Sequence, residues 1–261
     1  MTPLELFGLI CVLAIVRLAM SFRPVAAANN AAVGPAPDAG SASATAGVPS
    51  PTFTMVVKEY LDAFIVAGLV ALLLITFVVR TFFIPSGSMI PTLQIHDVLL
   101  VNEFEYRFTK PAREDIVVFP PPIPSPNDFI KRLIGAPGDT LRIHNGIVYR
   151  NGEALVEPYE AQKPNYELEI KNYNIYVDGT PLDPTLANIP PKDKWQAPDK
   201  IPDGAYFMMG DNRNNSEDSH IWGFAQADGT FMAGPLKGQK ATFTGHAFLT
   251  FWPLDRLHIL H

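Results

Sequence analysis

Two apolar runs separated by a polar segment occupy the start of the chain. The first run covers residues 6–16. The second, at 63–79, carries no charge, and with Phe82 and Phe83 it gives about 20 largely apolar residues interrupted by Arg80, the length that spans a bilayer. The pattern predicts two transmembrane helices, over residues 1–20 and 58–83, and Pro85 is expected to end the second.

The flanks of the first run favour a membrane span over a cleavable signal peptide. Such a signal normally begins with positive charge and ends in small residues, whereas Glu5 precedes this run and Arg17 follows it. Residues 21–57 are rich in Ala, Gly, Pro and Ser and predict a linker without a core. Arg17, Arg23 and Lys58 flank this linker, which places it in the cytoplasm and both chain ends outside.

The pattern changes to that of β-strands after residue 97. Asn145-Gly146 and Asn151-Gly152 are strong signals for hairpins between alternating strands. No helical periodicity competes with the strand pattern. Runs of apolar or β-branched residues bounded by turn residues occur at 98–101, 115–119, 129–134, 140–143, 147–150, 205–209 and 247–252.

These runs predict a mainly β fold, an antiparallel β-sheet domain in two parts over residues 84–156 and 203–261. The segment between them, residues 157–202, is rich in Pro, Asp, Asn and Lys and holds only two short strand-like pieces, at 168–170 and 173–177. We therefore expect residues 157–202 to form an inserted second lobe.

Composition narrows the classes of function. With 261 residues and 48% hydrophobic content, the chain can build the core of one soluble domain besides membrane segments. A net charge of −6 without a dense Lys/Arg cluster argues against nucleic acid as a partner. The single cysteine, Cys11, excludes an intrachain disulfide. Asp211, Asp218 and His220 lack a recognised ligand spacing, so we expect no metal and no organic cofactor.

A candidate nucleophile follows the second apolar run, where Ser86 and Ser88 stand in the stretch 84–93. A serine hydroxyl needs a base within hydrogen-bond reach. No histidine lies in a recognisable nucleophile elbow. The histidines are His96, His144, His220, His246, His258 and His261.

A lysine is the other candidate base. Lys131 lies in the apolar run 129–134, and burial there must lower its pKa from about 10.4 by about 2–3 to make it useful at neutral pH. The alternative is an exposed Lys131-Arg132 pair that guards an edge strand. A third polar stretch, residues 209–223, is denser in hydrogen-bonding side chains than a solvated turn requires, and its Asn214-Asn215-Ser216 also fits a glycosylation sequon.

Taken together, these stretches resemble the bacterial type I signal peptidases, also called leader peptidases. The motifs stand in the order of that family and cover most of residues 84–223. They are Pro85-Ser86-Gly87-Ser88-Met89 with Pro91-Thr92-Leu93, Arg113-Glu114-Asp115-Ile116-Val117-Val118-Phe119, Lys131-Arg132 with Gly135 and Pro137-Gly138-Asp139, and Gly210-Asp211-Asn212-Arg213 with Ser216, Asp218-Ser219 and Trp222-Gly223.

The resemblance implies a serine–lysine dyad with Ser88 as nucleophile and Lys131 as general base. It implies an oxyanion hole made by the Ser86 hydroxyl and the Ser88 N–H, and it implies that Ser216 orients Lys131. Further support for the dyad would come from Asp211, Arg213 and Asp218, and the substrate pocket from Ile84, Pro85 and Ile130. This chain has His220 where the family usually has arginine, which leaves the partner of Asp218 open.

The function implied is that of a membrane-bound serine endopeptidase that removes N-terminal signal peptides from exported preproteins, cutting after small residues in Ala-x-Ala. The implied location is the bacterial inner membrane, as a multi-pass protein whose catalytic β domain lies on the periplasmic side. Its partners would be secreted preproteins and the lipid bilayer, near the protein-export translocon.

Three alternatives stay open at this point. A catalytically silent, membrane-anchored β module could capture extended peptides, but the presence of Ser88, Lys131 and Ser216 together argues against it. A repressor-type Ser–Lys self-cleaving protein needs a DNA-binding helical region in place of the apolar runs. A peptidase dedicated to one secretion system is not separated from the housekeeping enzyme by sequence.

Overall fold

The computed structural model describes residues 12–14, 16–17, 53–77, 79–191, 198–227 and 229–260. The chain divides into two compact units, Met1–Thr76 and Phe77–His261. Most of the first predicted span, residues 1–20, and most of the predicted linker lie outside the described residues.

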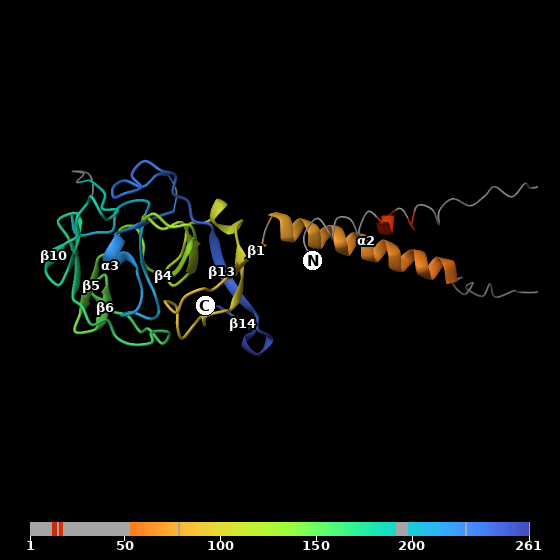
Figure 1. Ribbon diagram of the computed structural model, residues 1–261, viewed down its shortest axis with the longest axis horizontal. Coiled ribbons are helices and arrows are strands. Elements are labelled where there is room, and N and C mark those ends of the chain that lie inside the picture. The colour runs from red at the N-terminus through yellow and green to blue at the C-terminus, as the bar shows by residue number, and fades with distance from the viewer. Residues whose placement is uncertain are drawn as a thin grey trace, which may run out of the picture. The chain divides into compact units, whose positions relative to one another are not determined.

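The first unit is dominated by helix α2, Phe53–Phe77, shown in orange in Figure 1. Its stretch of Leu, Ala, Ile and Val contains one glycine and no proline, a composition compatible with a continuous helix. Arg17 forms an ion pair with Asp62 on this helix, with Nε 2.6 Å from Oδ1. Over the residues that the structure describes, no helix is both long enough and apolar enough to cross a membrane.

The prediction of one helix over residues 58–83 was wrong at both ends. The helix begins at Phe53, inside the predicted linker, and ends at Phe77, so Pro85 does not terminate it. Strand β1, Val79–Phe83, follows and pairs antiparallel with β2, Val98–Asn102. Strand β1 contains β-branched and aromatic residues, which suit a half-buried pleated surface. It makes five register pairs with β2, and this pairing stabilises a strand where the apolar pattern alone predicted a helix.

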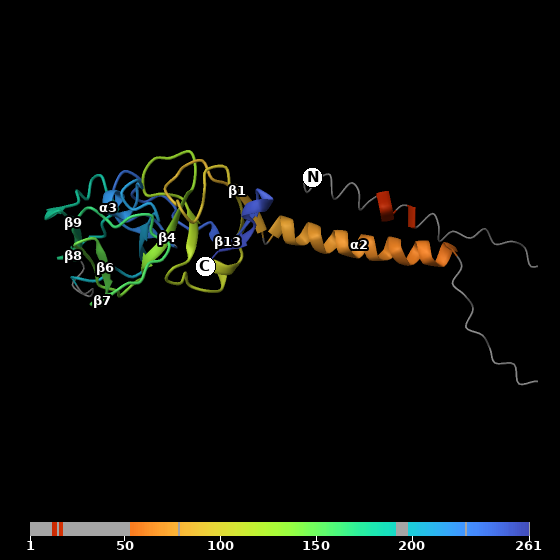
Figure 2. The same cartoon turned by 90° about the horizontal axis from the view of Figure 1, so that it is seen from below.

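The second unit contains the larger of two antiparallel sheets, with strand order β1-β2-β13-β3-β4-β11-β12 and β14 added beside β13. In both views β1 and β13 lie at one end of this unit, and β4 lies between them and the smaller sheet (Figures 1 and 2). The remaining strands of the larger sheet are β3 Ile116–Phe119, β4 Phe129–Gly135, β11 Ala205–Met209, β12 Ala225–Gln226, β13 Gly245–Trp252 and β14 His258–Ile259.

The smaller sheet has the order β10-β9-β8-β5-β6-β7. Its central hairpin turns at Asn145 and Gly146, whose φ angles of 50° and 72° are those of the predicted Asn-Gly turn. The strands are β5 Leu141–His144, β6 Ile147–Arg150, β7 Glu153–Ala154, β8 Leu168–Lys171, β9 Asn174–Val177 and β10 Thr180–Pro181.

This sheet corrects the predicted domain boundary. The second lobe is not an insertion confined to residues 157–202, because β5, β6 and β7 from the predicted first part belong to the same sheet as β8 to β10, joined to them through the pairing of β5 with β8. A hairpin signal shows that two neighbouring runs pair, but it carries no information about which sheet the hairpin joins. The mainly β, antiparallel fold class itself is confirmed, since every strand pair is antiparallel.

The smaller sheet shares its apolar core with β4 and β11 of the larger sheet. Alternate residues of β3 belong to two further apolar clusters, so the larger sheet is buried on both faces. In the smaller sheet, alternate residues point inward, and Ile143, Val148 and Ile175 are almost completely buried. In the larger sheet, β3 is buried along its whole length and β4 from Lys131 to Gly135. Short helices complete the unit: α3 Ser219–Trp222 and the 3-10 turns Glu105–Arg107 and Leu254–Arg256.

We predict that Ile143→Ala lowers the free energy of unfolding by about 2–5 kcal/mol, because it leaves a cavity under the smaller sheet. The matched control Val156→Ala shortens a side chain that is 92% exposed and should change the free energy of unfolding by less than about 0.5 kcal/mol. Denaturant unfolding of the full chain in detergent measures both. Equal effects of the two substitutions would contradict this account of the core.

Candidate active site

Ser88 and Lys131 lie in direct contact. Lys131 Nζ is 3.0 Å from Ser88 Oγ and 3.2 Å from the Ile130 carbonyl oxygen. Both side chains are largely buried, with 4% of Lys131 and 8% of Ser88 exposed. The alternative of an exposed Lys131 on an edge strand is therefore wrong. The side chain is buried, and its strand β4 lies between β3 and β11 in the sheet.

The serine is held by the segment that carries it. Ile84 N–H donates to Asp97 O and Ile84 O accepts from His96 N–H, both at 2.9 Å, which fastens the start of this segment. Met89, directly after Ser88, is completely buried, as is Leu93. The apolar residues of the motif thus act as anchors, and they leave Ser88 at the rim of the core.

Burial decides the protonation of Lys131. It lowers the pKa of the ammonium to about 8, against the opposing attraction of Asp218, Glu217 and Asp211. The Phe129 ring, whose centroid is 5.1 Å from Nζ, is part of this apolar surrounding. A lysine with such a pKa is neutral in a substantial fraction of molecules at mildly alkaline pH, and a neutral amine can accept the proton of the serine hydroxyl.

The segment 210–216 closes over the serine motif. Asn212 donates its backbone N–H to Ser88 O and its side-chain amide to Gly87 O, both at 3.0 Å. Gly210 has no room for a side chain, because a Cβ there would overlap Ser216 Oγ and the Ser88 carbonyl. The close approach of two backbones explains why the turn after β11 begins with glycine.

An open cleft of about 380 Å³ lies in front of the pair. Pro85, Ser86 and Ile130 line it together with Ser88 and Lys131. Ile84 is not among its lining residues, because alternation along the segment turns its side chain into the core, where it is 2% exposed. The first residues of β4 lie beside the cleft, and β11 pairs with β4 only from Arg132 onward.

The comparisons with known proteins bear on this geometry. A family model described as "Signal peptidase, peptidase S26" matches residues 57–244, well over half of the chain. The chain belongs to this family. It is therefore a serine peptidase, a hydrolase that acts on peptide bonds, as the resemblance of its motifs implied.

Individual relatives agree with the family model. A "Probable signal peptidase I-1" of Synechocystis sp. is 36% identical over 215 residues, which cover 80% of this chain and 89% of that protein. The "Signal peptidase I" of Pseudomonas aeruginosa is 36% identical over 181 residues, covering 63% of this chain and 62% of that protein. A crystal structure of a signal peptidase I from Enterococcus faecalis V583 is 35% identical, covers 45% of this chain and 91% of that chain, and has a TM-score of 0.32.

Ser216 in this peptidase makes no contact of the expected kind with Lys131. Its hydroxyl is buried and has no hydrogen-bond partner within the described residues. It lies against Gly210, close to the Ser88 carbonyl. An unpartnered buried hydroxyl is costly.

Asp218 fastens the polar segment from within. It is completely buried, accepts the Gly210 N–H at 3.1 Å and caps helix α3 through the His220 N–H. Asp218 also contacts the His220 ring, whose Nδ1 is 2.5 Å from Asp218 Oδ1. His220 is thus the partner of Asp218 that the sequence left open. Tyr166 stacks on this ring, with centroids 4.5 Å apart.

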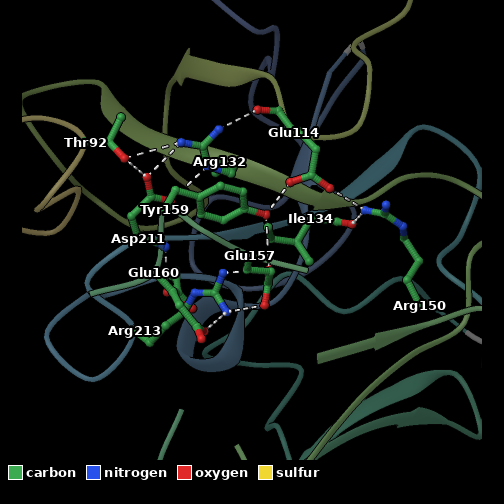
Figure 3. Close-up of polar contacts among 12 residues, drawn as sticks. Thr92, Glu114, Arg132, Ile134, Arg150, Glu157, Tyr159, Glu160, Asp211 and Arg213 are labelled. Atoms are coloured by element: carbon green, nitrogen blue, oxygen red, sulfur yellow. Dashed lines mark hydrogen bonds and ion pairs between the residues drawn. The ribbon is translucent and has the colours of Figure 1, made fainter. Parts of the chain in front are cut away.

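Arg132, on strand β4, forms a buried ion pair with Asp211 (Figure 3). Two parallel hydrogen bonds of 2.8 and 2.9 Å join them, and Thr92 Oγ1 donates to the same carboxylate at 2.5 Å. Both charged side chains are at most 1% exposed. The pair ties β4 to the segments that carry Ser88 and Ser216, which is the structural support expected of Asp211.

Arg213 is held by a carboxylate from outside its own segment. Its guanidinium donates two hydrogen bonds to Glu157, at 2.7 and 2.9 Å (Figure 3). Tyr159 lies nearby, with its ring 3.9 Å from Arg132 Cζ and its hydroxyl bonded to Glu114 and Glu157. Sequence reasoning missed Glu157 and Tyr159, because they stand in a stretch whose composition resembles an insertion.

No group of three or more His, Cys, Asp or Glu side chains that could hold a metal ion occurs in the described ranges of the peptidase. The observed arrangement is a hydroxyl and an amine in a shared cleft, braced by buried ion pairs. Such an arrangement can carry out proton transfer and nucleophilic attack.

We predict that Lys131→Met stabilises the folded protein at pH 7. Because the pKa of Lys131 is about 8 in the fold and about 10.4 in an unfolded chain, folding at pH 7 must desolvate or deprotonate the ammonium. The variant should gain about 1–3 kcal/mol at pH 7, and the gain should shrink as the pH rises from 8 to 10.5. Thermal unfolding in detergent at pH 7 and pH 10 measures it, and a lower Tm of the variant at pH 7 would refute the interpretation.

Proposed function

We propose that this peptidase removes N-terminal signal peptides from exported preproteins with Ser88 as nucleophile and Lys131 as general base. The observation that carries the proposal is the 3.0 Å contact between the buried Lys131 Nζ and Ser88 Oγ. Membership in the signal peptidase family supports the substrate class.

In the first step, neutral Lys131 accepts the proton of Ser88 Oγ while Oγ attacks the carbonyl carbon of the scissile bond. The carbonyl oxygen becomes an oxyanion, and the Ser86 hydroxyl and the Ser88 N–H stabilise it. Neither of these donors makes a hydrogen bond within the part of the chain that the structure describes, so both are available to substrate. One such donor is typically worth about 10²–10³ in rate.

In the second step, the amide bond breaks, and the leaving nitrogen takes the proton held by Lys131. The signal peptide is then bound to Ser88 Oγ as an ester. Lys131, neutral again, removes a proton from a water molecule, whose oxygen attacks the ester carbonyl. Ser88 Oγ leaves and is reprotonated, which restores the starting state.

The cleft supports cleavage after small residues. Pro85, Gly87 and Ile130 line the cleft together with Ser88, and in our proposal they form a shallow apolar hollow for the residue before the cut. Ile84 closes this hollow from the core side in our proposal, although its own side chain is buried. The edge of β4 before Arg132 offers backbone groups to an extended substrate, which would add as a strand. Alanine fits such a hollow, and larger side chains meet its walls.

We place the protein in the bacterial inner membrane, with the catalytic β domain on the periplasmic side and close to the translocon that delivers preproteins. The support is the pair of apolar runs in the sequence, at residues 6–16 and 63–79. In this proposal Ser216, Asp211, Arg213 and Asp218 hold the dyad in place from the neighbouring segment, and no metal or organic cofactor takes part.

We expect the full chain in detergent to cleave a preprotein with an Ala-x-Ala site after its second alanine, as mapped by mass spectrometry. Ser88→Ala and Lys131→Met should lose at least about 10³ in kcat/KM, because each removes one half of the dyad. Ser125→Ala, which removes the hydroxyl of another serine in the cleft lining, is the matched control and should remain active. Retained cleavage by Ser88→Ala would overturn the assignment of the nucleophile.

The rate should rise with pH along a titration with a midpoint near 8. The reason is that only the neutral form of Lys131, whose pKa is about 8, accepts the serine proton. A pH profile of kcat/KM between pH 6 and pH 10 checks this. A rate that already reaches its plateau at pH 6 would mean that another group acts as the base.

A further inference from the structure

The cleft in front of Ser88 carries an excess of negative charge. Among the described residues that line it, the charged ones are Lys131, Asp128 and Glu217. The neighbouring buried guanidinium groups do not balance the two carboxylates, because Arg132 pairs with Asp211 and Arg213 with Glu157. When Lys131 is neutral, as the reaction requires, two negative charges therefore remain in the cleft.

Both carboxylates are exposed to the space that a substrate would occupy. Asp128 immediately precedes β4, and one of its oxygens accepts a hydrogen bond from Thr244 Oγ1 at 2.7 Å. Glu217 follows Ser216 and makes neither a hydrogen bond nor an ion pair within the described residues. Each carboxylate thus keeps acceptor oxygens free for a ligand.

The two groups line the same cleft as the reacting side chains of Ser88 and Lys131. Asp128 stands three positions before Lys131, which corresponds to at most about 10 Å along a strand. Glu217 attracts the Lys131 ammonium electrostatically and so raises the pKa of the amine, against the effect of burial. A field that reaches the lysine also reaches the side chains of a peptide bound across the serine.

We propose that Asp128 and Glu217 determine charge specificity in the peptidase, so that it prefers substrates with a Lys or Arg side chain within about three residues of the scissile bond and rejects Asp or Glu there. This inference rests on the proposed function of the same cleft and adds to it the class of side chain that accompanies the small residues. The attraction is strongest in the reactive state, because neutral Lys131 no longer offsets the carboxylates.

The test uses the full chain in detergent and peptides that span an Ala-x-Ala cleavage site. Lys, Gln or Glu is placed in turn at each position within three residues of the cut, apart from the two alanines, and kcat/KM is measured at pH 9.5. At one or more positions the Lys peptide should be cleaved about threefold to tenfold faster than the Glu peptide. The ratio should fall towards one in 0.5 M NaCl, because salt screens exposed charges.

Two variants assign the effect. Glu217→Gln and Asp128→Asn should each reduce the Lys-to-Glu ratio and together abolish it. Glu153→Gln, which removes an exposed carboxylate from the smaller sheet, should leave the ratio unchanged. In addition, Glu217→Gln should shift the pH profile of kcat/KM to lower pH, a shift that a merely structural role would not produce.

The outcomes separate this inference from the proposed function. If the Gln peptide is cleaved after the second alanine but Lys and Glu peptides react equally at every position, the charge preference is wrong and the function stands. If the ratio is the same in the parent and in the double variant, other groups set it and the assignment to Asp128 and Glu217 is wrong. If no peptide is cleaved by the folded parent, the proposed function fails.

Discussion

The removal of the Lys131 ammonium from water is the physical constraint on which the rest of the site depends. A charged amine that is 4% exposed loses most of its hydration, and the fold compensates by making the neutral form accessible. This requires the apolar strand β4 that carries the lysine, the Phe129 ring 5.1 Å from its amine, and the Ser88 hydroxyl 3.0 Å away as a side-chain acceptor. The burial that packs Lys131 into the core therefore also provides the neutral amine that can accept a proton.

The distribution of carboxylates follows from the same constraint. A carboxylate in direct contact with Lys131 would stabilise its charged form and raise its pKa. Instead, two buried acids of the segment 210–218 are engaged elsewhere, Asp211 with Arg132 and Asp218 with His220. The Asp211–Arg132 pair connects this segment to β4, and burial still lowers the pKa of the lysine. The exposed Glu217 has no such partner among the described residues, which leaves its charge directed at the cleft.

The local elements were predictable because their signals are local. The two Asn-Gly turns and the alternating runs between them correspond to observed hairpins and strands. The range of the second helix was not predictable in the same way, because residues 79–83 are as apolar as a helix end and become a strand only through pairing with β2. Likewise, the hairpin of β5 and β6 joins the smaller sheet through β8, a contact that the hairpin motif does not encode.

By itself, the sequence determined the mainly β class, the order of the motifs and the residue types that could perform acid–base chemistry. Only the tertiary structure decided which of them meet: Lys131 and Ser88 are 43 positions apart, Arg132 and Asp211 79, and Thr92 and Asp211 119. It also placed Arg213 with Glu157, left Ser216 without a partner among the described residues and turned Ile84 into the core. The physical reason is that burial and pairing over such separations depend on how whole sheets pack, whereas propensity and turn chemistry act over a few residues.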